Sequence, residues 1–255
     1  MPRTIGPSEP RPSRDARPAR VRLGLLVLVT DHTTERDFHR LVGDPEVAVY
    51  VNRVAYANPL NADNLRAMRP YLRDAAAAIL PDEPLDALAF SCTSGSALIG
   101  DDAVRATLDE GKPGVPAVTP TAAAGAAFEA LGVSRVALLA PYEQAVSETL
   151  AAYFADTLGV TISTLQYLDY DDDREIARIP PDAVVDLGTR LLAEDPGAEA
   201  LFVSCTATRA AETVERLEAL TGRPVVTSNQ AMIWRALRAA GETGPITGLG
   251  RLGRL

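Results

Sequence analysis

The sequence predicts an α/β protein of two pseudosymmetric lobes, each with a four-stranded parallel sheet flanked by helices. Apolar runs alternate with helical patterns from residue 21 onward, and this alternation requires parallel strands joined by helical crossovers. The two cysteines, Cys92 and Cys205, lie 113 positions apart, each in a Ser-Cys-Thr triplet that ends an apolar run. The runs 22–26 and 135–139 share this offset. A shared offset at two landmarks indicates one unit of about 110 residues used twice.

Four apolar runs in the first half predict strands at 21–29, 47–54, 85–91 and 115–119. Apolar residues at helical spacing predict helices at 34–42, 63–79, 94–110 and 120–131. The first run is apolar throughout, which is typical of a strand buried on both faces of a parallel sheet. Thr34 and Asp37 can cap the first helix, and Pro59 prevents the second strand from continuing directly into a helix.

The second half repeats this plan, with strands expected at 135–140, 160–168, 200–204 and 224–227. Helices are expected at 146–158, 181–193, 208–220 and 229–240. A helix precedes the strand that starts at 135, whereas only the N-terminal segment precedes the strand that starts at 21. We therefore expect the last helix to fill the vacant place on the first sheet.

If the last helix packs on the first sheet, the chain divides into three parts. Residues 1–20 are rich in Pro and Arg and contain no apolar segment, so they are expected to form a disordered tail. Residues 21–118 together with 228–245 form the first lobe, and 119–227 form the second. The active site is expected between the lobes.

The charge of the chain limits its partners. The formal net charge is −9, divided into +3 for residues 1–20 and −12 for the remainder. A body this acidic argues against nucleic acid, which needs a basic face. No apolar stretch reaches the roughly 18 residues of a membrane helix. With no export signal either, we expect a cytoplasmic protein with two free thiols.

Both cysteines are predicted at the carboxyl ends of strands, where open parallel sheets bind ligands. A single buried cysteine is usually a small packed hydrophobe, but two matched thiols favour a catalytic pair. The N–H groups just after each cysteine are expected to hold a substrate carboxylate. They belong to Thr93, Ser94, Thr206 and Ala207. Helices that start near the thiols would lower the thiol pKa toward neutrality.

This arrangement predicts proton transfer at a carbon next to a carboxylate. Loss of the α-proton gives an enediolate, which donors already in place stabilise. A thiol on either face allows removal from one side and return from the other. Reacting atoms lie about 3–3.5 Å apart, so the sulfurs are expected roughly 6–7 Å apart, too far for a disulfide. The predicted activity is a racemase or isomerase of a small carboxylate, with no cofactor.

The matched cysteines, with Ser or Thr beside each, make residues 21–250 resemble the aspartate/glutamate racemase superfamily. The segments Ser-Cys-Thr-Ser-Gly at 91–95 and Thr-Ser-Asn-Gln at 227–230 are similar to one branch of it. That branch contains maleate cis–trans isomerases, arylmalonate decarboxylases and ectoine-utilisation racemase-like proteins, and the last group is the most similar. The resemblance implies flavodoxin-like lobes, no cofactor and a carboxylate at their interface. It also implies substrate-binding roles for Tyr142, Thr30 and Asn58.

Departures from the family pattern leave several activities open. Ordinary amino-acid racemases carry Asn-Thr and Thr-Glu after their cysteines, whereas this chain has Thr-Ser after Cys92 and Thr-Ala after Cys205. Arylmalonate decarboxylases keep only the second cysteine, so Cys92 argues against decarboxylation. Maleate isomerases keep both and use the first as a nucleophile. A two-lobed, non-catalytic binding protein is the alternative from another class.

Other patterns are set aside. Residues 248–253 match GxGxxG, but only two residues follow, so no helix can start there to hold a pyrophosphate. The acidic stretch 169–175 begins like a calcium loop, but Arg174 and Pro180 stand where glycine and glutamate are needed. We interpret it as a solvated loop. Two histidines are too few for a histidine metal site, so no metal is expected. A homo-oligomer stays open, with the helix of Trp234 as a candidate surface.

Overall fold

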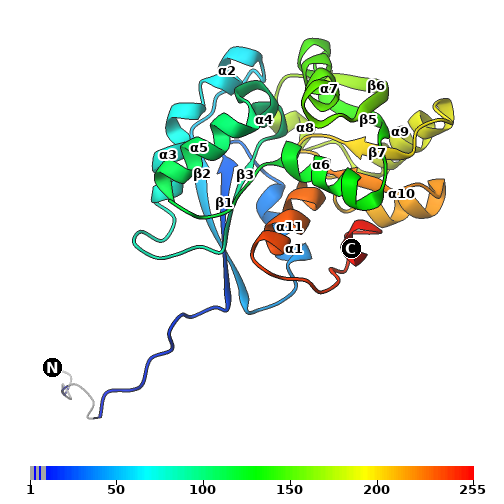
Figure 1. Cartoon of the computed structure of the whole chain (residues 1–255). Helices are drawn as coiled ribbons and strands as arrows, with labels where there is room; N and C mark the ends of the chain where they lie inside the picture. The colour runs from blue at the N-terminus through cyan, green and yellow to red at the C-terminus, as the bar shows by residue number, and fades with distance from the viewer. Residues whose placement is uncertain (1–2, 4–5, 7–9) are drawn as a thin grey trace.

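The computed structural model describes residues 3, 6 and 10–255. It contains two four-stranded sheets with strand orders β2-β1-β3-β4 and β6-β5-β7-β8. All the strand pairings in them are parallel. The second order repeats the first when its strands are counted from β5. The predicted fold class is therefore confirmed, and Figure 1 shows the two lobes side by side.

The first sheet is organised around β1, which is buried along its whole length as its continuous apolar run predicts. The strands are β1 (Val21–Leu28), β2 (Val47–Val54), β3 (Ala87–Ser91) and β4 (Ala117–Val118). The helices in this half are α1 (Thr34–Leu41), α2 (Ala62–Arg66), α3 (Arg69–Ala77), α4 (Thr93–Ile99), α5 (Asp101–Gly111) and α6 (Pro120–Leu131).

The second sheet has β5 in the corresponding place. Its strands are β5 (Arg135–Tyr142), β6 (Thr161–Tyr170), β7 (Ala200–Val203) and β8 (Val225–Thr227). The helices are α7 (Gln144–Leu158), α8 (Asp173–Ile176), α9 (Pro181–Glu194), α10 (Val214–Thr221) and α11 (Ser228–Ala239), followed by a 3₁₀ turn at Leu252–Arg254. Phe128, Phe154 and Phe202 pack α6, α7 and β7 together with ring centroids 5.1–6.0 Å apart.

Three helices differ from the sequence prediction. The helix expected at 63–79 is two helices, α2 and α3. The helix expected at 94–110 is divided at Gly100, whose φ of 91° lies in a region that glycine adopts readily. The helix expected at 208–220 begins only at Val214. The chain leaves Cys205 with a φ of 83° and forms turns before the helix can start.

Two helices connect the lobes. Helix α11, at the end of the chain, contacts β3 and β4 of the first sheet, and it also packs along α6. Helix α6 in turn contacts β8 and α7 of the second lobe. Figure 1 shows α11 in orange beside the green α6. These contacts match the vacancy argument made from the sequence, while the exact domain boundaries stay a prediction.

The N-terminal segment is only partly described. Residues 1–2, 4–5 and 7–9 of the expected disordered tail lie outside the described residues. Nearer the first strand, Arg17 forms an ion pair with Asp86. Arg20 pairs with both Asp44 and Glu242. This basic segment is therefore joined to acidic groups of the first lobe and of the loop after α11.

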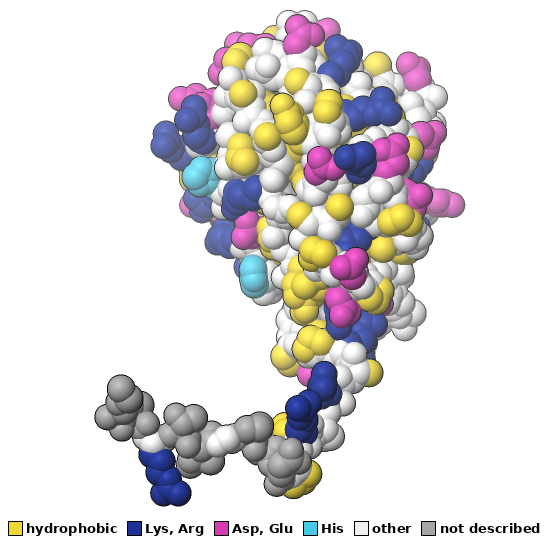
Figure 2. All heavy atoms as spheres, turned by 90° about the vertical axis from the view of Figure 1, so that its left-hand side faces the viewer, with side chains coloured by type: hydrophobic (Ala, Val, Ile, Leu, Met, Phe, Trp, Pro, Cys, Tyr) yellow, Lys and Arg dark blue, Asp and Glu magenta, His cyan; other side chains and the backbone are white. Residues whose placement is uncertain are grey.

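The surface carries charges of both signs. Figure 2 shows acidic and basic side chains interspersed over one face of the molecule. The ion pair between Arg36 and Glu212 links α1 to the turns after Cys205. Within 10–255 and the two isolated described residues, no helix has the length and apolar character of a bilayer span.

Candidate active site

A buried cavity lies where the lobes meet, beyond the carboxyl ends of their strands. Its volume is about 10 Å³, about the space that one water molecule needs. Seven of the nine predicted site residues line it. The full lining is Leu28, Asp31, Leu60, Leu65, Cys92, Thr93, Ser94, Tyr142, Asp173, Cys205, Thr206 and Ala207. Each lobe thus contributes one cysteine to a single cavity.

Cys92 is held at the start of α4. It follows β3 and is the N-cap of the helix, and the N–H of Gly95 donates to its Sγ at 3.3 Å. The Oγ of Ser94 lies 3.9 Å from the same sulfur. A Cβ added at Gly95 would lie 2.8 Å from this Sγ, so the glycine is what allows the helix backbone to approach the thiol.

Cys205 is held by a strained turn and not by a helix. It follows β7 with a φ of 83°, which is uncommon for a residue with a side chain and typical of functional sites. The N–H of Ala207 donates to its Sγ at 3.4 Å. The helix that was expected to act on this thiol begins nine residues later, at Val214.

Burial controls the protonation of both thiols, contrary to the expectation of a lowered pKa. Desolvation raises the pKa of Cys92 to about 12 and raises that of Cys205 further. The negative charge of Asp173 raises both pKa values as well, and it outweighs the N–H groups that donate to the sulfurs. In the closed cavity both cysteines are therefore neutral thiols at neutral pH.

The hydroxyls beside the cysteines position the two thiol-bearing segments. The Oγ1 of Thr93 donates to Ser228 at the start of α11 at 2.8 Å. The Oγ1 of Thr206 donates to the carbonyl of Ser91 at 3.3 Å, and the carbonyl of Thr206 accepts from Asn229 at 2.9 Å. The two bonds of Thr206 cross between the lobes. Among the described residues, the N–H groups of Thr93 and Thr206 have no acceptor and remain available to a ligand.

Tyr142 closes the wall beside Cys205. It ends β5, is fully buried, and its Oη lies 3.1 Å from the Oγ of Ser204. Burial raises its pKa far above the ordinary value of 10.0, so the phenol is a neutral hydrogen-bond donor. This placement is consistent with the carboxylate-binding role implied by the family resemblance.

Thr30 and Asn58, the other two predicted residues, do not line the cavity. They instead bond to the acidic stretch that follows β6. Each of three consecutive aspartates there accepts one hydrogen bond from a loop of the first lobe, and we call these three contacts the 171–173 bridge. They are Leu60 N–H to the Asp171 carbonyl at 2.6 Å, Asn58 Nδ2 to Asp172 Oδ1 at 2.9 Å, and Thr30 Oγ1 to Asp173 Oδ2 at 2.7 Å.

The interpretation of 169–175 as a solvated loop is wrong at Asp173, which is only 4% exposed and lines the cavity. Burial raises the pKa of Asp173 to about 6. Asp31 also lines the cavity, but it serves α1: its Oδ1 accepts the N–H groups of Thr33 and Thr34 at 3.1 and 2.9 Å. Neither acid was singled out from the sequence.

Tyr56 is a further group that sequence reasoning missed. Its Oη is buried and has no hydrogen-bond partner in the described part of the chain. Burial, together with the negative charge of Asp173, raises its pKa. The only feature of the sequence that pointed to Tyr56 was the polar segment after the second strand, to which it belongs.

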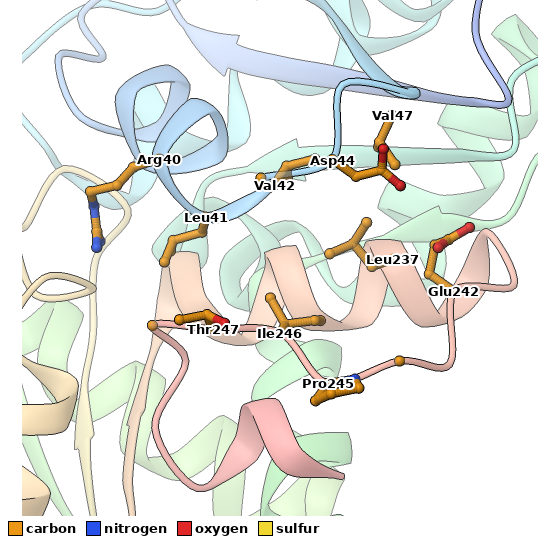
Figure 3. Close-up of a pocket in the computed structure, with 13 residues that line it drawn as sticks. Arg40, Leu41, Val42, Asp44, Val47, Leu237, Glu242, Pro245, Ile246 and Thr247 are labelled. Carbon is orange, nitrogen blue, oxygen red and sulfur yellow. The ribbon is translucent and has the colours of Figure 1, made fainter.

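A larger groove lies elsewhere and contains neither cysteine. Its volume is about 600 Å³, and Figure 3 shows it bounded by the end of α1, by α11 and by the loop after α11. Its two acids, Asp44 and Glu242, both pair with Arg20. The smaller cavity, and not this groove, holds the reactive groups. In the described residues no cluster of three His, Cys, Asp or Glu could hold a metal ion.

Two parallel α/β lobes that each bring a cysteine to one cavity define a two-lobed enzyme of the Asp/Glu racemase-like superfamily. The chain belongs to the arylmalonate decarboxylase family, whose model matches residues 53–253. It is 32% identical to the arylmalonate decarboxylase of Bordetella bronchiseptica over 128 residues, which are 50% of this chain and 53% of that enzyme. This chain therefore spans about half the length of that relative in the alignment.

Maleate isomerases are similar as well. The enzyme of Pseudomonas putida is 27% identical over 187 residues, 70% of this chain and 74% of that protein. A cysteine-to-serine mutant of the Nocardia farcinica maleate cis–trans isomerase, solved with a covalently bound succinylcysteine intermediate, has a TM-score of 0.82 at 25% identity. The match covers 92% of this chain and 98% of the isomerase chain. A liganded double mutant of arylmalonate decarboxylase has a TM-score of 0.82 at 26% identity, and the match covers 91% of this chain and 98% of the decarboxylase chain.

Proposed function

We propose that the protein is a cofactor-independent racemase or isomerase that moves a proton at the carbon next to a carboxylate. Cys92 and Cys205 are its acid/base pair. The observation that carries this proposal is that two matched strand ends, one in each lobe, bring a thiol to the same buried cavity. A non-catalytic binding protein would not need this pairing.

The reaction starts from one thiol in its thiolate form. The thiolate takes the α-proton, and the substrate becomes an enediolate, stabilised by the N–H groups that follow the cysteines and by Tyr142. The opposite thiol then gives its proton to the other face of the carbon and becomes the thiolate. Because burial keeps both cysteines neutral in the closed site, one must lose its proton to solvent as the substrate binds.

Isomerisation of a carbon–carbon double bond is the second candidate. It is supported by the succinylcysteine intermediate of the Nocardia farcinica relative, in which a cysteine sulfur is bonded to the substrate carbon. A thiolate of Cys92 or Cys205 would add to the double bond in the same way, and rotation followed by loss of the thiolate would give the other isomer. Decarboxylation, the activity named for the other relatives, would need only one of the two thiols.

The test is a set of small acids incubated with the protein in D₂O and followed by NMR. The set contains both enantiomers of several 2-amino acids, maleate, phenylmalonate and a compound of the ectoine-degradation route, which the resemblance implies. Deuterium at the α-carbon indicates proton transfer, fumarate indicates isomerisation, and loss of CO₂ indicates decarboxylation. A cytoplasmic location, which suits free thiols, is part of the proposal.

Substitution of either thiol identifies its role. We expect Cys92→Ser and Cys205→Ser each to lower turnover by about 10²–10⁴-fold, the usual contribution of a proton-transfer group. Ser96→Ala is the matched control, because its buried Oγ on α4 has no partner among the described residues. Undiminished turnover in either cysteine variant would refute the acid/base pair.

A further inference from the structure

Asp173 is a buried acid in the cavity with one free side. Its Oδ2 accepts the hydroxyl of Thr30 at 2.7 Å, while no described residue donates to its Oδ1. The side chain is 4% exposed and lines the cavity together with both thiols. No Lys or Arg is among the residues that line the cavity. The nearest basic side chain along the chain, Arg174, is turned to Asp172.

Helix capping does not account for this carboxylate, and the bond from Thr30 occupies only one of its two oxygens. The helix it begins, α8, is capped by Asp172, whose Oδ1 accepts the N–H of Arg174 at 2.8 Å. Asp31, the other acid of the cavity, has its oxygens occupied by α1. A buried carboxylate is costly unless it is paired. Asp173 therefore has the position of a group whose partner arrives with the ligand.

We propose that Asp173 binds a cationic nitrogen of the substrate, so that the substrate is a small zwitterionic acid. This inference rests on the proposed function and names its substrate class. The carboxylate of the ligand lies on the N–H groups that follow the cysteines, and an ammonium or amidinium group next to the reacting carbon pairs with Oδ1 of Asp173.

The chemistry of the reaction favours such a substrate. A positive nitrogen beside the reacting carbon makes the α-proton more acidic. The same positive charge offsets the negative charge of Asp173, which otherwise disfavours a thiolate on either cysteine. One ligand cation would thus satisfy the buried acid and help to form the base.

Dianionic substrates fit this cavity poorly. Maleate and arylmalonate, for which the relatives are named, each carry two carboxylates. Bound here, the second carboxylate would lie near the ionised Asp173 in a site with almost no solvent, where like charges repel strongly. Asp173 is therefore proposed to separate this chain from relatives that act on dicarboxylates.

Three probes that differ in one substituent test the proposal by calorimetry: 2-aminobutyrate, 2-hydroxybutyrate and ethylmalonate. They carry an ammonium, a hydroxyl and a carboxylate at the same carbon. We expect the protein to bind 2-aminobutyrate at least tenfold more tightly than 2-hydroxybutyrate, and ethylmalonate most weakly. Asp173→Asn should abolish the preference for the ammonium and strengthen ethylmalonate binding at least tenfold. The control, Glu175→Gln, removes an exposed charge two residues away and should change neither ratio.

Equal affinities for the three probes, no binding of 2-aminobutyrate, or unchanged ratios in Asp173→Asn would overturn the assignment of Asp173. The proposed function is read separately, as deuterium exchange at the α-carbon of each probe. Ammonium-selective binding that depends on Asp173 but gives no exchange would support the cation site and refute the racemase. Deuterium exchange that is unchanged in Asp173→Asn would support the racemase and refute the cation site.

Discussion

Asp173 is the residue at which function and stability are expected to oppose each other. Its pKa is raised from 3.8 to about 6, chiefly by burial. Because the folded-state pKa is above the unfolded one, ionisation opposes folding: the penalty is absent below pH 4 and develops as the pH rises through 6. We expect Asp173→Asn to raise the free energy of unfolding at pH 7.5, by up to about 3 kcal/mol, and to have little effect at pH 3.5. Thermal unfolding at the two pH values measures this difference.

The control for this stability prediction is again Glu175→Gln, which should leave the melting temperature unchanged at both pH values. The amide of Asn can still accept the hydroxyl of Thr30, so the variant keeps that bond. An Asp173→Asn protein that is less stable at pH 7.5 than the parent would mean that the carboxylate has a structural partner besides Thr30.

At the residue scale, the sequence predicted that the two thiols share one cavity, but not that a buried acid lies beside them. Cys92 and Cys205 were accessible to prediction because each ends an apolar run and the two share one offset. Asp173 was not, because an acidic run along the chain looks like a solvated loop. Its burial depends on Thr30, which is 143 positions away in sequence, and on the placement of α8 against the first lobe.

At the scale of elements, the loop after β6 closes the cavity. The 171–173 bridge ties it to the loops after β1 and β2, and the enclosed volume of about 10 Å³ is too small for any organic acid. A substrate can enter only if these elements separate. Domain or loop opening around a ligand is a common form of such motion.

Weakening the bridge should expose the thiols. We expect Asn58→Ala, which removes the bond to Asp172, to speed alkylation of Cys92 and Cys205 by iodoacetamide several-fold at a fixed pH. Mass spectrometry of the modified cysteines measures the rate. Asn52→Ala is the control. It removes a hydrogen bond from the side-chain amide of Asn52 on β2 to the carbonyl of Ala75, and this bond does not touch the cavity. Equal alkylation rates in the two variants would show that the bridge does not govern access.

The sequence predicted the strands better than the helices, for a physical reason. Buried strands are apolar throughout, so their positions are visible in a single run, as for β1 and β3. Helix ends depend on backbone geometry that composition does not reveal. Gly100 divides α4 from α5 with a positive φ, and Cys205 also has a positive φ, after which the chain forms turns up to α10.

At the scale of the whole molecule, the two lobes depend on each other. Helix α11 covers β3 and β4 while it packs on α6, and α6 contacts the second sheet. The vacancy before the first strand predicted this connection, since a parallel sheet needs helices on both faces. The cavity is formed by both lobes, so cooperative folding also keeps the two thiols together.

We therefore expect the two lobes to unfold in a single transition. Trp234, the one tryptophan of the chain, lies buried on α11 and its fluorescence reports that helix, whereas far-ultraviolet circular dichroism reports all helices. Urea curves from the two probes should coincide, which is the test of two-state unfolding. Ile233→Ala, which truncates a fully buried side chain of α11, should lower both midpoints equally, at a cost of about 2–5 kcal/mol. A fluorescence transition that separates from the circular dichroism transition would show that α11 leaves the first sheet while the second lobe stays folded.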